Sequence, residues 1–264
     1  MSAARAVRGT SVFLDRGGQQ VIAFDSREAV MEAAAEQVLA TARLSIANRG
    51  RFTWALSGGS TPAGAYQRLA TDRFSKRIDW ERVWFFWGDE RCVPPDDEQS
   101  NYRMAKQALL DAVAPPVEHV HRMRGEDPPA QGAARYEALL REAFELEDDA
   151  PPPPLDLVFL GMGEDGHTAS LFPGTPVVHE RARWVCPNQA PDGTSRLTLT
   201  PAVLNAAAQV VFLVVGAAKA ARLGQVLRSR PGASDVAPAG RVDPARGAVR
   251  WLVDAEAAAQ LKGR

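Results

Sequence analysis

Residues 155–170 read Leu-Asp-Leu-Val-Phe-Leu-Gly-Met-Gly-Glu-Asp-Gly-His-Thr-Ala-Ser, an apolar run that ends abruptly in a glycine-rich, charged segment. Two earlier stretches, Phe52–Leu56 and Val83–Trp87, have the same character, and each is followed by glycine or charged residues. A strand that is apolar at nearly every position belongs to a sheet with both faces covered by helices. The three stretches therefore predict buried parallel strands with polar loops at their carboxyl ends.

Strand-like and helix-like segments alternate along the whole chain, an order typical of the α/β class. Asp25 or Ser26 is suited to cap a long alanine-rich helix that ends at residues 48–50. The other expected elements are strands at 21–24, 211–215 and 250–253 and helices at 217–227 and 255–261. A strand follows the polar, proline-rich connector 147–154 directly, so we interpret this connector as a surface crossover. We expect a single domain, residues 1–264, with a largely parallel central sheet flanked by helices.

The composition argues against two kinds of partner. Lysines and arginines number 31 against 32 acidic residues, so the net charge near zero provides no field to hold nucleic acid. The longest apolar run, residues 210–215, is far below the roughly 20 residues of a membrane-spanning helix. We expect neither nucleic acid nor a membrane as a partner.

The cysteines and the N-terminal segment indicate the compartment. Cys92 and Cys186 lie far apart and form no C-x-x-C pair, which fits a reducing compartment. No apolar stretch suited to a secretory signal follows Arg5 and Arg8. We expect a cytoplasmic protein whose two cysteines are buried thiols without a catalytic role.

The loop after the strand Phe52–Leu56 has the features of an anion site. It reads Ser57-Gly58-Gly59-Ser60-Thr61-Pro62 and leads into a helix whose first turn accepts the proline. Glycines let the backbone approach a phosphate, and free N–H groups at a helix start attract its charge. An ordinary strand-to-helix turn is the alternative, and no Gly-Lys-Ser/Thr follows that would make this a Walker loop.

Three charged residues, Asp89-Glu90-Arg91, come shortly after the strand Val83–Trp87, and Ser100 marks the start of the next expected helix. In an open α/β sheet ligands bind at the carboxyl ends of the strands, so Asp89 and Arg91 are expected to face one. Arg91 is able to donate two parallel hydrogen bonds to a phosphate or a carboxylate. A solvated turn with a local ion pair is the alternative.

The glycines of the third loop, Gly161, Gly163 and Gly166, match the dinucleotide-binding pattern G-x-G-x-x-G after a strand. We nevertheless reject a nicotinamide site. The helix of such a site should be long, but Pro173-Gly174 would end this one after about two turns. No clear strand-ending acidic residue follows at the distance that the ribose contact requires.

His167 in the same loop is a candidate general base, because imidazole accepts a proton near neutral pH. Asp165 is close enough in sequence to orient the ring or to hold a water, although a structural histidine is the alternative. His119 and His121, on one face of an expected short strand, and His179 in a loop lack the further ligands of a metal site. We expect no metal. A G-x-S-x-G elbow is also missing, which favours activated water over an acyl-serine.

With the three loops taken together, the sequence resembles the 6-phosphogluconolactonase family over nearly its whole length. The matching segments are residues 57–62, 89–91, 93–94, 100–101 and 161–173, and further downstream 196–200, 205–207, 216, 219–220 and 251–254. The resemblance implies a parallel-sheet α/β fold shared with glucosamine-6-phosphate deaminases, no cofactor, and hydrolysis of 6-phosphoglucono-δ-lactone in the oxidative pentose phosphate route. We expect this small molecule as the only partner of a monomeric enzyme.

The resemblance also assigns roles residue by residue. The expected catalytic residues are His167 and Arg91, together with Asp165 and Asp89, which we add because of their positions in the same loops. The expected substrate- and phosphate-binding residues are Gly58, Gly59, Ser60, Thr61, Arg91, Arg196 and Lys219. His167 is the general base in this assignment, and the three cations face the phosphate or the sugar-acid oxygens.

Two rival functions stay open. Glucosamine-6-phosphate deaminases bind a hexose phosphate with similar loops, but an aromatic residue typically follows their acidic pair, where this chain has Arg91. Their histidine loop also tends to carry a Glu, where this chain has Leu171-Phe172-Pro173. A non-catalytic sugar-phosphate sensor would need a DNA-binding helix-turn-helix, and the sequence before the first expected strand is too short for one.

Overall fold

The computed structural model describes residues 11–16, 19–229 and 236–261, so Arg5 and Arg8 lie outside the described residues. A seven-stranded sheet forms its centre, in the order β1-β2-β10-β9-β6-β3-β4. β1 (Ser11–Arg16) pairs antiparallel with β2 (Gln19–Phe24), and every other neighbouring pair in this sheet is parallel. The predicted α/β class with a largely parallel central sheet is therefore confirmed.

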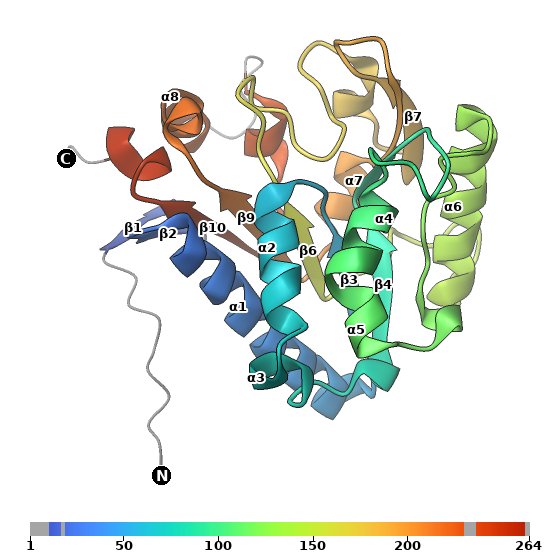
Figure 1. Cartoon of the computed structure of the whole chain (residues 1–264). Helices are drawn as coiled ribbons and strands as arrows, with labels where there is room; N and C mark the ends of the chain where they lie inside the picture. Colours follow the sequence, from blue (N-terminus) through green and yellow to red (C-terminus); the bar gives the residue numbers. More distant parts are fainter. Residues whose placement is uncertain (1–10, 17–18, 230–235, 262–264) are drawn as a thin grey trace.

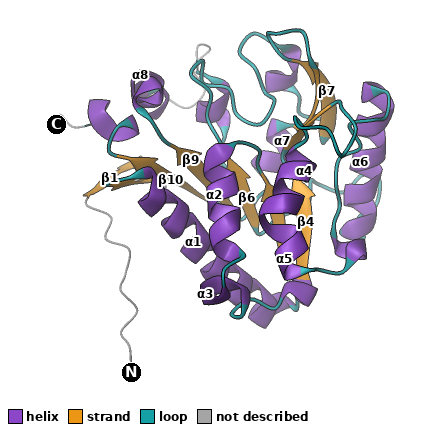
Figure 2. Ribbon diagram, in the orientation of Figure 1, coloured by secondary structure: helices purple, strands orange, loops and turns teal. Residues whose placement is uncertain are grey.

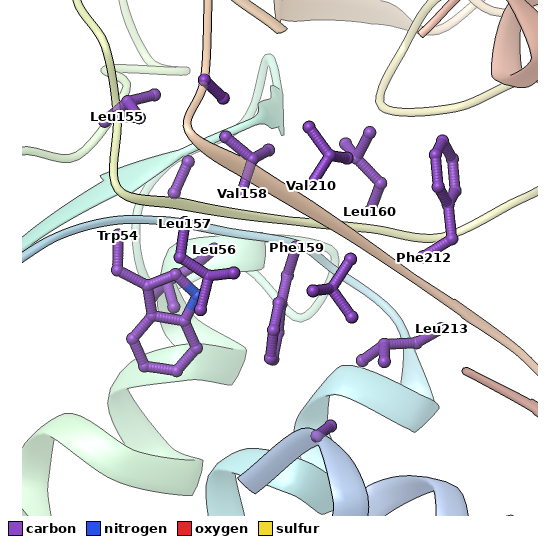
Figure 3. Packing of buried hydrophobic residues seen from close by; sticks show 14 of the residues in the cluster. Trp54, Leu56, Leu155, Leu157, Val158, Phe159, Leu160, Val210, Phe212 and Leu213 are labelled. Carbon is purple, nitrogen blue, oxygen red and sulfur yellow. The ribbon is translucent and has the colours of Figure 1, made fainter. Parts of the chain in front are cut away.

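The strands of the sheet lie close to where the apolar runs predict them. Those after β2 are β3 (Phe52–Leu56), β4 (Val83–Trp87), β6 (Leu157–Leu160), β9 (Gln209–Val214) and β10 (Ala248–Asp254). β3 and β6 are buried at every position, because side chains on both of their faces meet other apolar residues. Figure 3 shows Val158 and Leu160 of β6 on one side of the sheet and Phe159 on the other, where it meets Trp54 edge-on at 5.2 Å.

The long helix α1 (Arg27–Arg49) has both of its predicted ends. Ser26, rather than Asp25, is the N-cap, since its Oγ accepts a hydrogen bond from the Ala29 N–H at 3.2 Å. Gly50 ends the helix with a left-handed φ of 76° and donates its N–H to the Ile46 carbonyl. α1 lies beside α2 (Ser60–Leu69) over one face of the sheet (Figure 1).

The other helices complete the layers around the sheet (Figure 2). They are α3 (Asp72–Ser75), α4 (Asn101–Ala105), α5 (Asp111–Val113), α6 (Pro129–Ala143), α7 (Pro201–Leu204) and α8 (Ala220–Arg228). α8 is preceded by a 3-10 turn, Ala217–Lys219, where we expected regular helix from residue 217. The expected terminal helix at 255–261 is wrong, because that segment forms one 3-10 turn, Ala257–Gln260, with its first N–H held by the Asp254 carboxylate.

The expected short strand carrying His119 and His121 is also wrong. His119 ends a 3-10 turn, Val117–His119, and this segment pairs with β4 only through an isolated bridge at Val120. Two prolines precede the turn and donate no ladder hydrogen bonds, which leaves too short a stretch for a strand. The His119 ring instead stacks on Trp84, with centroids 4.7 Å apart. The His121 ring stacks on Phe86, with centroids 4.8 Å apart, and lies tilted against Trp84 at 5.3 Å.

A second, three-stranded antiparallel sheet was not predicted. It has the order β5-β8-β7, from β5 (Asp89–Arg91), β8 (Ser195–Leu199) and β7 (Val185–Gln189). β7 lies at the upper right of Figure 1, beyond the large sheet. Because β5 continues the chain directly after β4, this small sheet is joined to the carboxyl edge of the large one.

Two further predictions concern the surface. The connector 147–154 joins α6 to β6 and is mostly exposed, as a surface crossover should be. Within the part of the chain that the structure describes, no helix combines the length and the apolar character needed to cross a membrane.

Candidate active site

A cavity of about 630 Å³ opens at the carboxyl edge of the parallel strands. The loops that follow β3, β4, β6 and β9 all contribute to its wall, as parallel strand order requires. Its lining contains the sequence-predicted residues Gly58, Gly59, Ser60, Thr61, Asp89, Arg91, His167, Arg196 and Lys219. Asp165 does not line the cavity but contacts His167 from behind. The structure thus brings the three sequence motifs together around one space.

The first wall is the glycine loop, residues 57–62, between β3 and α2. Tyr66 of α2 anchors its start, since the Tyr66 hydroxyl accepts from the Ser57 N–H and donates to the Ser57 carbonyl. Gly59 has a φ of 101°, a backbone conformation that requires glycine. α2 begins directly after it, and no side chain caps the helix. Its first N–H groups have no intrahelical acceptor, an arrangement that suits binding of an anion.

The two arginines lie opposite each other on neighbouring strands of the small sheet. Arg91 of β5 pairs in register with Arg196 of β8. Among the described residues neither guanidinium forms an ion pair, although Arg91 Nη1 donates to the Gln99 carbonyl at 2.8 Å. Burial and the nearby Arg91 charge both lower the pKa of Arg196, which stays protonated. Two adjacent cations without a carboxylate partner favour binding of an anion.

Asp89 is more enclosed than the sequence indicates, with 8% of its surface exposed. Its Oδ2 accepts from the Ser170 hydroxyl at 2.7 Å, and its Oδ1 accepts from the Asn101 amide at 3.3 Å. The carboxylate therefore ties β5 to the end of the histidine loop, besides forming part of the cavity wall.

Glu90, which we did not single out from the sequence, points away from the cavity into the protein and is 2% exposed. Its carboxylate accepts hydrogen bonds from the backbone N–H groups of Arg91, Asn101 and Tyr102 and from the Ser100 hydroxyl. Burial raises the pKa of Glu90, although the three backbone donors oppose this effect. The result is a rigid connection between β5 and the start of α4.

His167 and Asp165 form a hydrogen-bonded pair in the loop after β6. The imidazole Nδ1 lies 2.6 Å from Asp165 Oδ1, and the same oxygen accepts the His167 backbone N–H at 3.0 Å. The geometry therefore assigns the tautomer in which Nδ1 is protonated and donates a hydrogen bond to Asp165. Nε2 is then the basic nitrogen. The His167 side chain is 35% exposed and lines the cavity, so Nε2 is accessible to water and substrate.

The electrostatics of this pair favour an ionised Asp165. Burial by itself would raise the pKa of Asp165, but the His167 backbone N–H and imidazole outweigh it, so the pKa lies below its ordinary value. An added Cβ at Gly163 would lie 2.1 Å from His167 Nδ1, so glycine is required there to leave room for the pair. Phe172 packs against the other side of the imidazole, with ring centroids 4.8 Å apart.

The segment after Gly166 differs from what the sequence suggested. We expected a helix of about two turns there, but residues 167–175 contain no helix. Two side chains hold this loop in place. The Thr168 hydroxyl donates to the Gly161 carbonyl at 2.8 Å, and the Ser170 hydroxyl donates to Asp89 Oδ2 at 2.7 Å. This irregular loop gives a pyrophosphate no helix N-terminus, in agreement with the rejection of a nicotinamide site.

Two more cations line the cavity. Lys219 lies in the 3-10 turn after β9, and Arg27 is the first residue of α1, after β2. In the described parts of the chain neither side chain makes an ion pair or a hydrogen bond. Sequence reasoning missed Arg27 because it belongs to no glycine-rich or charged motif. The one feature of the sequence that could have pointed to Arg27 is its position directly after a strand and a helix N-cap.

No group of three potential metal ligands occurs among the residues that the structure describes. The expected absence of a metal and of a cofactor stays a prediction.

Comparison with known proteins identifies the family. The model of the family described as glucosamine-6-phosphate isomerases/6-phosphogluconolactonase matches residues 25–251. The chain belongs to this 6-phosphogluconolactonase family. A curated 6-phosphogluconolactonase of the cyanobacterium Nostoc is 44% identical over 219 residues, covering 82% of this chain and 87% of the relative.

Solved structures of the family have the same fold. The 6-phosphogluconolactonase from Trypanosoma cruzi superposes with a TM-score of 0.82 at 29% identity, covering 92% of this chain and 97% of that one. A monomeric glucosamine-6-phosphate deaminase superposes with a TM-score of 0.74 at 20% identity, covering 91% of this chain and 99% of that one. The second likeness concerns the fold alone, and it confirms the predicted similarity to the deaminase fold.

Proposed function

We propose that this chain hydrolyses 6-phospho-D-glucono-1,5-lactone to 6-phospho-D-gluconate, the lactonase step of the oxidative pentose phosphate route. The observation that carries the proposal is the His167–Asp165 pair at the wall of a cavity that also contains several unpaired cations. A base accessible to water suits ester hydrolysis, and the cations suit a phosphorylated substrate. Membership of the 6-phosphogluconolactonase family and 44% identity to a curated lactonase support the same reaction.

The reaction begins with a water held by His167 Nε2. As Nε2 takes a proton, the water oxygen forms a bond to the lactone carbonyl carbon, and the carbonyl oxygen becomes an oxyanion. Asp165 holds the opposite ring nitrogen and stabilises the imidazolium that forms. The tetrahedral intermediate then collapses, the bond to the ring oxygen breaks, and the imidazolium returns its proton to that oxygen, which becomes a hydroxyl.

The developing oxyanion needs a hydrogen-bond donor, which is either a backbone N–H of the loop after β6 or the side chain of Arg91. The Gly163 N–H already donates to the His167 carbonyl at 2.9 Å, so it is not free to stabilise an oxyanion. Arg91 lines the cavity with its guanidinium and carries a fixed positive charge. We propose Arg91 for this role, with Asp89 holding its strand to the histidine loop.

The phosphate is proposed to bind to the free N–H groups of residues 59–61 and to the side chains of Lys219 and Arg196. These N–H groups lie at the start of α2, where backbone dipoles favour a negative charge. Lys219, in the 3-10 turn after β9, and Arg196 of β8 both line the cavity, and their two positive charges match a phosphate dianion.

The test is the rate of 6-phosphogluconate formation from freshly generated lactone, with a chelator present and the spontaneous rate subtracted. General-base catalysis is worth about 10²- to 10⁴-fold, so His167→Ala should lower kcat by that factor while product binding persists. His179→Ala is the matched control, because His179 is exposed and lies outside the cavity. A His167→Ala enzyme with an undiminished rate would exclude His167 as the base.

The rival activities are tested with the same protein. A wild-type chain without any rate on the lactone would contradict the proposal, and ammonia release from glucosamine 6-phosphate would then identify a deaminase. Binding of 6-phosphogluconate without either reaction would identify a sensor. We expect lactone hydrolysis and no ammonia release.

We also propose that the protein acts as one domain, as a monomer and in the cytoplasm. Cys92 and Cys186 are free thiols, as a reducing compartment favours. Light scattering on the purified protein checks the oligomeric state, and a mass near the 28.5 kDa of one chain is expected.

A further inference from the structure

Asn101, the first residue of α4, lies between the glycine loop and β5. Its side chain is 4% exposed and lines the cavity. The amide Nδ2 donates to the Asp89 carbonyl oxygen at 2.9 Å and to Asp89 Oδ1 at 3.3 Å. These two hydrogen bonds fix the carboxamide to β5 and leave its Oδ1 facing the glycine loop.

Gly58 is the residue of the glycine loop that the Asn101 side chain contacts. A Cβ built on Gly58 would lie 2.0 Å from Asn101 Oδ1 and 2.5 Å from Asn101 Cγ, distances that no real contact reaches. The φ of Gly58 is not in the left-handed region, so its backbone conformation does not itself require glycine. Close packing against Asn101 is therefore what requires glycine at this position.

Asn101 is itself held in place from the side opposite the cavity. Its backbone N–H donates to Glu90 Oε1 at 2.7 Å, and the neighbouring Tyr102 N–H donates to Glu90 Oε2 at 2.8 Å. Ser100 adds its hydroxyl to the same carboxylate and caps α4 through the Arg103 N–H. Because Glu90 is buried and accepts all of these donors, Asn101 has little freedom to move when the loop moves.

We propose that Asn101 is a positioning residue for the substrate phosphate: its carboxamide holds Gly58 against β5 and thereby sets the direction of the N–H groups of residues 59–61. This deepens the proposed function and rests on it. Gly59, directly after Gly58, has the φ of 101° that turns the chain into α2. A shift of Gly58 is therefore carried directly to the N–H groups at the start of the helix.

A competing explanation is that Gly58 is glycine because the phosphate itself approaches its backbone. The two explanations differ in what a second substitution does. If Asn101 occupies the space, shortening Asn101 makes room for a methyl group at position 58. If the phosphate occupies the space, shortening Asn101 does not improve the binding of substrate by the Gly58→Ala variant.

The experiment is a double-mutant cycle of Gly58→Ala, Asn101→Ala and the double variant. We expect Gly58→Ala to raise KM for the phosphorylated lactone about 10- to 100-fold, since misplacement by about 1 Å costs that much. Asn101→Ala should raise KM about 10-fold because Gly58 loses its support. In the double variant KM should fall back to about the Asn101→Ala value. For all three, KM for the phosphorylated lactone should change more than kcat does, and more than the rate on unphosphorylated glucono-δ-lactone does.

A double variant no better than Gly58→Ala would overturn the proposal, since the two losses would then be independent. A double variant that regains the melting temperature lost by Gly58→Ala without regaining KM would also overturn it, because Asn101 would then serve packing alone. Gly88→Ala is the control glycine variant. A Cβ there meets its nearest atom at 3.5 Å, an ordinary contact, and Gly88 lies outside the cavity lining.

The same cycle separates this proposal from the proposed function. Calorimetry with 6-phosphogluconate measures Kd without turnover. A wild-type chain that hydrolyses no lactone would end the proposed reaction, whereas recovery of Kd in the double variant would still support the role of Asn101. Active wild-type enzyme without recovery in the double variant would end the role of Asn101 alone.

Discussion

At the scale of single residues, Arg27 is placed to act as a further cation for the substrate phosphate. It directly follows the Ser26 cap of α1, and it lines the cavity, as Lys219 does. A charge-assisted hydrogen bond from a guanidinium to phosphate is among the stronger polar contacts in proteins. We therefore predict that Arg27 contacts the phosphate rather than the reacting carbon.

Arg27→Gln should accordingly raise KM for the phosphorylated lactone about 10-fold and leave kcat nearly unchanged, because it removes binding that ground state and transition state share. We expect unphosphorylated glucono-δ-lactone to be a poor substrate for the wild type, and the activity on it should not change. Steady-state kinetics on both lactones measures this. Arg43→Gln, an exposed position on the same helix, is the control. Equal losses on both lactones would place Arg27 away from the phosphate.

At the scale of elements, the amino ends of β3 and β6 are joined by a reciprocal pair of side-chain contacts. The Thr53 N–H donates to Asp156 Oδ2 at 2.9 Å, and the Asp156 N–H donates to Thr53 Oγ1 at 3.0 Å. Arg49 at the end of α1 pairs with the same carboxylate. These contacts lie at the opposite edge of the sheet from the cavity, so they serve stability rather than binding.

We expect Asp156→Ala to lower the free energy of unfolding by about 2 kcal/mol, because the buried Thr53 N–H loses its acceptor. Thr53→Val, which removes only the hydroxyl acceptor, should cost about 1 kcal/mol. Urea unfolding measures both values. KM for the lactone should stay within about 2-fold of the wild type in each variant. A large change in KM would mean that the two edges of the sheet are coupled.

At the scale of the whole molecule, stability should fall on mild acidification. Burial, with a contribution from nearby His119, lowers the pKa of His121 from 6.5 to about 4. Between these two pH values the unfolded chain binds a proton that the folded chain does not, so stability is lost as pH falls from about 6.5 towards 4. Within the described segments, the buried His121 Nε2 finds no hydrogen-bond partner that would favour the charged ring.

From pH 7 to pH 5 we expect this group to remove about 1–2 kcal/mol of the free energy of unfolding. His121→Phe keeps a ring in the stack with Phe86 and Trp84 and cannot titrate. Urea unfolding of both proteins at the two pH values measures the difference. The pH dependence should be smaller in the variant by that amount, and identical losses in the two proteins would rule out His121 as the cause.

Much of the site could be predicted from the sequence because its residues follow strands directly. Parallel strands bring their carboxyl ends to one edge, so Thr61, Arg91 and His167 were expected to meet before any distance was known, whereas Lys219 was expected from the family resemblance alone. The His167–Asp165 pair was also within reach of sequence reasoning, since two residues of one loop form it. Roles that depend on a partner far along the chain, such as that of Asn101 beside Gly58, had no local signal.

By itself the sequence determined the parallel strands of the large sheet, the long helix and its caps, because apolar runs, a Ser cap and a terminal glycine act within a few residues of one another. It also indicated which loops meet at the cavity. Only the tertiary structure decided the small sheet that sets Arg91 opposite Arg196, the burial of Asp89 and Glu90, and the reach of Arg27 into the cavity. The physical reason is that these features depend on contacts between segments far apart in the chain, whose energies no local pattern records.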